Sequence, residues 1–148
     1  MIDRTAGDGV HPGRPADEGA PLAVPGPAGP AVVDLSVLAG LFRSLGDRAP
    51  MAEGRLIDAF RREAPRLLEQ LVGSLAAGDR ETLHRAAHTL KSSCAQLGAV
   101  AMSGLSADLE DASRESIPAG AADAIAALET EWVVVDAALS ARRRELPD

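Results

Sequence analysis

The chain has 148 residues, of which 46% are hydrophobic but only 2% aromatic, and its formal net charge at pH 7 is −7. With so few aromatic residues and no Tyr, the core must be built mainly from Leu, Val, Ile and Ala, which favours helices in one domain of this length. The acidic charge, with no basic cluster interleaved with aromatic residues, argues against nucleic-acid binding. No stretch approaches 18 uninterrupted apolar residues, so no membrane span is expected.

Two further features predict a cytoplasmic protein. Cys94 is the only cysteine, which excludes an internal disulfide and is typical of a reducing compartment. The residues after Met1 contain no apolar run that could serve as a signal peptide.

The first 31 residues differ in composition from the rest of the chain. They hold six of the ten prolines and six of the fourteen glycines. With so few bulky apolar side chains, burial cannot offset the entropy lost on ordering. We expect a disordered tail or linker at residues 1–31 and a folded domain at residues 32–148.

Two helices are expected at the start of the domain. Asp34 is placed as the N-cap of a short helix that ends at Gly46. Its apolar residues recur at steps of three and four: Leu35, Leu38, Phe42 and Leu45. A second helix is expected over residues 51–76, kinked by Pro65 and ended by Gly78.

The third expected helix is capped by Asp79 and closed by Gly98. Its apolar residues form one stripe at helical spacing: Leu83, Ala86, Ala87, Leu90, Cys94 and Leu97. His88 lies two residues before Leu90, about 200° around the helix, and should therefore point away from the core. The positions that share this outward face are His84, Lys91, Ser92 and Ala95.

Two more helices complete the expected fold. One covers residues 100–115, and the other follows Pro118, which is placed at its first helical position. The last helix carries a seam of apolar residues at an alternating three-four spacing: Ile125, Leu128, Trp132, Val135 and Leu139. We predict an all-α antiparallel four-helix bundle with a short additional N-terminal helix.

The outward face around His88 suits a phosphoryl acceptor. A neutral imidazole is a good nucleophile near its unperturbed pKa of about 6.5. A phosphoryl group adds close to two negative charges, and Lys91, one turn away, is within reach of them. The chain has fourteen arginines and one lysine, and that lysine is Lys91. Ser92, at i+4, is small enough to let a partner approach.

These residues carry a resemblance to a known family. Residues 87–93, Ala-His-Thr-Leu-Lys-Ser-Ser, are followed by Leu-Gly-Ala at 97–99. This resembles the signature of histidine-containing phosphotransfer (HPt) domains, Ala-His-x-Leu-Lys-Gly-Ser-x-x-x-(apolar)-Gly-Ala. The resemblance implies that His88 is the phosphorylated histidine and Lys91 the phosphate-stabilising lysine. Ser92 stands where the family usually has Gly, and two further family-like patterns lie at 63–65 and 105–110.

The resemblance also implies a function. A phosphocarrier of a two-component phosphorelay, not itself an enzyme, would carry a phosphoryl group on His88 between receiver-domain aspartates, or from a histidine kinase to a response regulator. The expected partners are a receiver domain, a hybrid histidine kinase, or both. Because the sequence shows no acidic pocket beside His88, we expect Mg²⁺ and the catalytic groups on the partner, and no cofactor on this chain.

The same residues allow two other interpretations. A helical protein-interaction module without phosphotransfer is the alternative function. His84 and His88 have a spacing that can bind a metal, but Arg85 replaces the Glu of zinc hydrolases and no third ligand is evident, so no metal is expected. His84 could tune His88, contact a partner or be inert. We place it with Ser92 and Ala95 on a partner-docking face.

Overall fold

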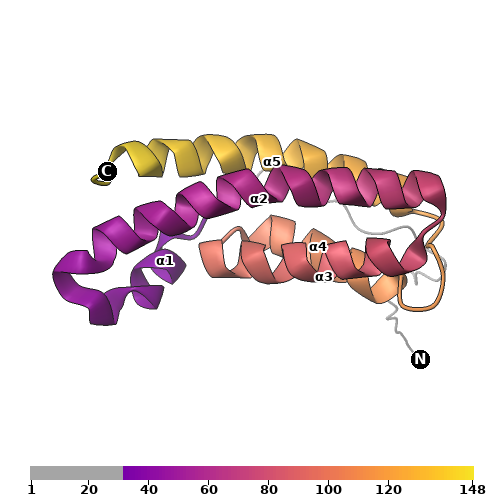
Figure 1. Cartoon of the computed structure of the whole chain (residues 1–148), viewed down its shortest axis with the longest axis horizontal. Coiled ribbons are helices and arrows are strands. Elements are labelled where there is room, and N and C mark those ends of the chain that lie inside the picture. Colours follow the sequence, from indigo (N-terminus) through magenta and orange to yellow (C-terminus); the bar gives the residue numbers. More distant parts are fainter. Residues whose placement is uncertain (1–31) are drawn as a thin grey trace, which may run out of the picture.

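The computed structural model describes residues 32–148, and the tail predicted at residues 1–31 lies outside the described residues. Every regular element in the described part is a helix (Figure 1). In chain order these are α1 (Leu35–Leu41), the 3-10 helix η1 (Arg43–Arg48), α2 (Ala49–Ala77), α3 (Arg80–Leu97), α4 (Val100–Ala112) and α5 (Ala121–Arg144).

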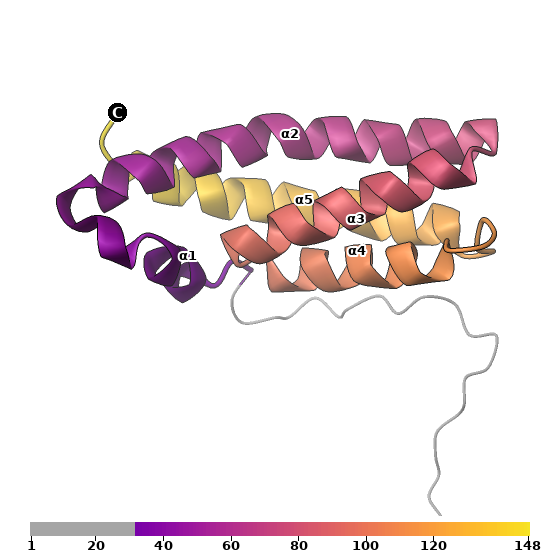
Figure 2. The same cartoon turned by 60° about the horizontal axis from the view of Figure 1, so that its bottom comes forward.

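The four long helices form an antiparallel bundle. Both α2 and α4 pack against α3 and against α5, so α3 lies diagonally across the bundle from α5. Helix α1 and η1 lie across one end, next to the end of α3 and the start of α2 (Figures 1 and 2). The predicted four-helix bundle with a short additional helix is therefore confirmed. In residues 32–148 no helix is both long enough and apolar enough to cross a membrane.

The apolar stripe of α3 lies in the core as expected. Its buried residues are the six that the sequence spacing indicated: Leu83, Ala86, Ala87, Leu90, Cys94 and Leu97. Cys94 has no exposed surface, and burial raises the pKa of its thiol to about 12. The thiol is therefore protonated at neutral pH and packs as a small apolar group.

The first predicted helix is wrong in its extent. The α-helix ends at Leu41, and Gly46 lies inside η1 with a φ of 55°. Leu35 and Leu45 are 45% and 42% exposed, and Leu38 is the buried residue of α1. A seven-residue helix makes only about two turns, so its face toward the core is short and holds one buried side chain.

Three further boundaries differ from the sequence prediction. Helix α5 begins at Ala121, and Pro118 precedes it, with its carbonyl oxygen accepting a hydrogen bond from the Ala121 N–H at 3.1 Å. Helix α4 ends at Ala112, three residues early. Helix α2 starts at Ala49 and continues through Pro65 without interruption. Such differences arise at helix ends, where local hydrogen bonds and turn geometry compete with the helix.

Gly98 joins the end of α3 to the start of the domain. Its φ is 77°, and its carbonyl oxygen accepts a hydrogen bond from the Asp34 N–H at 2.8 Å. A Cβ atom at this position would collide with the Asp34 carbonyl oxygen. The glycine of the Leu-Gly-Ala motif therefore both ends α3 and allows the backbone before α1 to approach closely.

Substitution of this glycine gives a test of that contact. We expect Gly98→Ala to lower the free energy of unfolding by about 2–4 kcal/mol, because left-handed strain is added to a backbone collision. Gly78→Ala is the matched control, since Gly78 also has a positive φ, 69°, but open space around its Cβ position. It should cost only about 1–2 kcal/mol. If urea denaturation gives equal losses in the free energy of unfolding for the two variants, the close contact with Asp34 contributes nothing, and Gly98 serves only to end α3.

Candidate functional site

His88 projects from the outer face of α3. Its side chain is 58% exposed, while the apolar stripe on the other side of the helix is buried. Ser92 and Ala95, on the following two turns, are also exposed. The outward direction of His88 is therefore confirmed, and it is bordered by small side chains.

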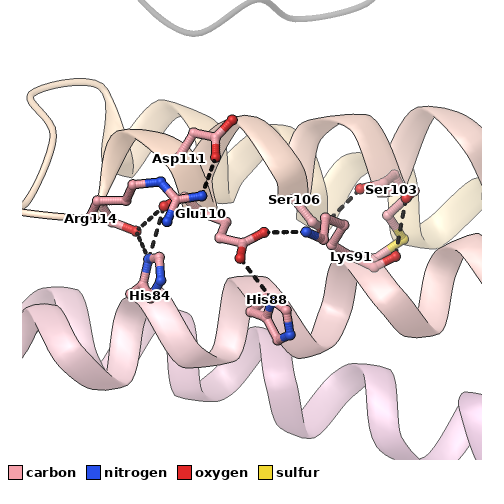
Figure 3. A network of polar contacts seen from close by, with 10 residues as sticks. His84, His88, Lys91, Ser103, Ser106, Glu110, Asp111 and Arg114 are labelled. Atoms are coloured by element: carbon pink, nitrogen blue, oxygen red, sulfur yellow. Dashed lines mark hydrogen bonds and ion pairs between the residues drawn. The ribbon is translucent and has the colours of Figure 1, made fainter.

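A carboxylate from α4 joins His88 to Lys91. Glu110 Oε2 lies 2.7 Å from His88 Nδ1, and Glu110 Oε1 lies 2.6 Å from Lys91 Nζ. Figure 3 shows the carboxylate between the two side chains of α3. The Glu110 side chain is only 7% exposed, whereas that of Lys91 is 35% exposed. One nearly buried anion thus positions both predicted site residues.

The charge of Glu110 determines which nitrogen of His88 is free. The hydrogen bond from Lys91 holds the pKa of the Glu110 carboxyl below its usual value, with a smaller contribution from His88, although burial acts in the opposite direction. An ionised carboxylate only accepts hydrogen bonds, so the nearby Nδ1 must carry a proton. In the neutral ring, Nε2 then holds the lone pair, and Figure 3 shows this nitrogen turned away from Glu110.

Glu110 is the functional residue that sequence reasoning missed. From the sequence we expected no acidic group beside His88. That expectation is wrong, because the Glu110 carboxylate lies next to the His88 ring. Glu110 lies 22 residues further along the chain, on a different helix. A signal existed, because Glu110 is the last residue of the family-like pattern at 105–110 and directly follows the buried Leu109, which places it at the edge of the core.

His84 contacts the backbone of α4, in addition to its place on the predicted docking face. Its Nδ1 lies 2.9 Å from the carbonyl oxygen of Glu110 and 3.3 Å from Ser113 Oγ. Ser113 Oγ donates to the same carbonyl at 3.1 Å. Because a carbonyl oxygen only accepts, Nδ1 of His84 donates to it. His84 is therefore half-buried and tied to the backbone of the residue that holds His88.

The described residues do not provide a set of side chains that could coordinate a metal ion at this site. Among residues 32–148, no three His, Cys, Asp or Glu side chains are grouped so that they could hold one. The two histidines with the metal-like spacing both have Nδ1 engaged on α4. The site instead presents one imidazole nitrogen, one cation and one buried anion.

Comparisons with known proteins place the chain in a family. The sequence model of the Hpt domain matches residues 55–143, which shows that the chain belongs to the Hpt domain family. Members of this family are phosphocarriers in phosphorelays and not enzymes. Among solved structures, the chain is similar to histidine-containing phosphotransfer protein B (HptB) from Pseudomonas aeruginosa PAO1, with a TM-score of 0.70 and 28% identity. The match covers 78% of this chain and 97% of the other. A comparison with curated proteins finds no match.

Proposed function

We propose that His88 accepts a phosphoryl group on Nε2 from the aspartate of a receiver domain, or from a histidine kinase, and passes it to another receiver. The observation that carries this proposal is the placement of Glu110 between His88 Nδ1 and Lys91 Nζ. It fixes the tautomer that leaves Nε2 with its lone pair, on the exposed side of the ring. A cytoplasmic location belongs to the same proposal.

The chemical step follows from this arrangement. The Nε2 lone pair of His88 attacks the phosphorus of the aspartyl phosphate, and the bond from phosphorus to the aspartate oxygen breaks to release the carboxylate. The imidazole gains positive charge as the new bond forms, and Glu110, through Nδ1–H, stabilises that charge. The reverse attack by a second aspartate restores the neutral ring. We expect Mg²⁺ on the receiver, where carboxylates and the phosphoryl group bind it.

The remaining predicted site residues have two different roles in this proposal. Ser92 and Ala95 are exposed on the same face as His88 and border the space that the receiver must enter. His84 acts as a positioning residue, because its hydrogen bond holds the Glu110 backbone at the end of α4. It can do this and still border the docking face, since its ring is only half-buried.

Lys91 is the residue that we expect to contact the phosphoryl oxygens. Its side chain is partly exposed, so the ammonium can remain near Glu110 while it faces incoming phosphate. A charge-assisted hydrogen bond contributes about 1.5–3 kcal/mol. Lys91→Ala should therefore slow transfer about ten- to a hundredfold. Lys91→Arg should restore only part of the rate, because the guanidinium distributes its charge differently. If Lys91→Ala transfers phosphate as fast as the parent, Lys91 does not contact the phosphoryl group.

The proposal is tested by following labelled phosphate between proteins. A panel of receiver domains is phosphorylated with labelled acetyl phosphate, freed of reagent and mixed with the chain. We expect label to move to the chain from at least one receiver, to be acid-labile there, and to return to a second receiver. A helical interaction module would bind a receiver without gaining label, and that outcome would refute phosphotransfer.

A further inference from the structure

A groove beside the phosphorylatable face has a distinct chemical character. It occupies about 330 Å³ between α2 and α3, on the opposite flank of α3 from Glu110 and α4. Its apolar part comes from both helices: Leu56, Ala59, Phe60 and Leu97. Ser93 and Gln96 of α3 also border it.

Two exposed arginines stand on the α2 rim of this groove. Arg62 and Arg66 lie one helical turn apart, and neither forms an ion pair with another residue of the described part of the chain. By contrast, Arg142 and Arg143 of α5 are paired with carboxylates of α2 at 2.6 and 3.0 Å. The rim also holds one acidic residue, Glu63. In a chain with a net charge of −7, this flank is locally cationic.

The groove is close enough to His88 to lie under the same partner. Ser93 and Gln96 follow His88 by five and eight residues, which is about 7–12 Å along the axis of α3. A typical protein interface buries about 800 Å² on each partner. A partner that places its reacting group on His88 and covers Ser92 therefore extends over the groove.

The charge of the partner favours the α2 flank over the α4 flank. A receiver that transfers phosphate from an aspartate presents that carboxylate and the acidic ligands of its Mg²⁺. On the α4 side, Asp108 and Asp111 are exposed, and the nearby exposed Arg114 is already paired with Asp111 at 3.0 Å, so this flank has no excess of positive charge. On the α2 side, Arg62 and Arg66 present charge opposite in sign to that of the receiver.

We infer that Arg62, Arg66 and the groove beside them form a docking surface for an acidic segment of the receiver domain, and that they orient the receiver over α2. An apolar side chain next to the receiver's carboxylates would enter the groove between Phe60 and Leu97. This inference rests on the proposed function, because it concerns the partner of the same site. It assigns to α2 a role in partner selection that is separate from the chemistry at His88.

The test separates docking from chemistry. The double variant R62E/R66E is compared with the parent chain and with R144E, which reverses an exposed charge on α5, diagonally opposite α3. Each protein is phosphorylated in two ways: by the labelled receiver that transfers fastest to the parent, and by phosphoramidate, a small donor that needs no docking surface. Transfer from the receiver is measured at 0.05 and 0.5 M salt.

We expect R62E/R66E to lower kcat/KM for transfer from the receiver about tenfold or more at low salt, with a smaller loss at high salt. Its phosphorylation by phosphoramidate and its melting temperature should match those of the parent, and R144E should transfer within about twofold of the parent. Parent-like receiver transfer by R62E/R66E, or an equal loss in R144E, would overturn the docking surface alone. Failure of the parent itself to accept phosphate from both donors would overturn the proposed function.

Discussion

Replacement of His88 by glutamine is expected to abolish phosphoryl acceptance from any donor. The amide has no nucleophilic nitrogen, so neither a phosphorylated receiver nor phosphoramidate should leave acid-labile phosphate on His88→Gln. Folding should be nearly unaffected, with a change in the free energy of unfolding within about 1 kcal/mol, because the side chain is 58% exposed. Labelling, circular dichroism and urea denaturation of the same preparation measure both expectations.

A neighbouring substitution controls for the change in side chain. Thr89 is the next residue of α3, and its side chain is exposed and lies outside the core. Thr89→Gln should therefore accept phosphate from phosphoramidate at the rate of the parent. Acid-labile label that persists in His88→Gln would mean that another residue carries the phosphoryl group.

The second large effect is expected at Glu110. Glu110→Gln keeps the shape of the side chain but removes the charge that accepts from both His88 and Lys91. A hydrogen bond to a charged group is worth about 1.5–3 kcal/mol, so acceptance from phosphoramidate should fall about ten- to a hundredfold. The loss should appear with this small donor as well as with a receiver, because it concerns the nucleophile and not docking.

Asp111→Asn supplies the matched control for Glu110→Gln. Asp111 is the next residue of α4, carries the same charge and pairs only with Arg114 at 3.0 Å within the described residues. It is exposed and should leave acceptance from phosphoramidate unchanged. If Glu110→Gln accepts phosphate as fast as Asp111→Asn, the contact with His88 Nδ1 has no part in the chemistry.

The parts of the fold that could be predicted depend on local sequence. Along α3 the apolar residues recur at helical spacing, Asp79 caps the start and Gly98 closes the end, so its bounds and its buried face follow directly. The same spacing fixes the outward direction of His88. The short first helix was predicted less well, because Leu35 and Leu45 follow the spacing but remain 45% and 42% exposed.

The contacts that complete the site come from a different helix and were not predicted. Glu110 reaches His88 because α3 and α4 pack side by side, and sequence spacing alone does not say which residues of two helices face each other. His84 was assigned to the docking face from its position on α3 alone. Its contact with the Glu110 carbonyl becomes visible only when the end of α4 is placed beside the start of α3.

The most direct measurement concerns the nitrogen that carries the phosphoryl group. The chain is labelled with ¹⁵N, phosphorylated with phosphoramidate and studied by long-range ¹H–¹⁵N and ³¹P NMR. Because Glu110 holds Nδ1 of His88 in its protonated form, we predict phosphorus bonded to Nε2 of His88, with Nδ1 still protonated. Phosphorus on Nδ1 of His88, or on His84, would contradict this account of the site.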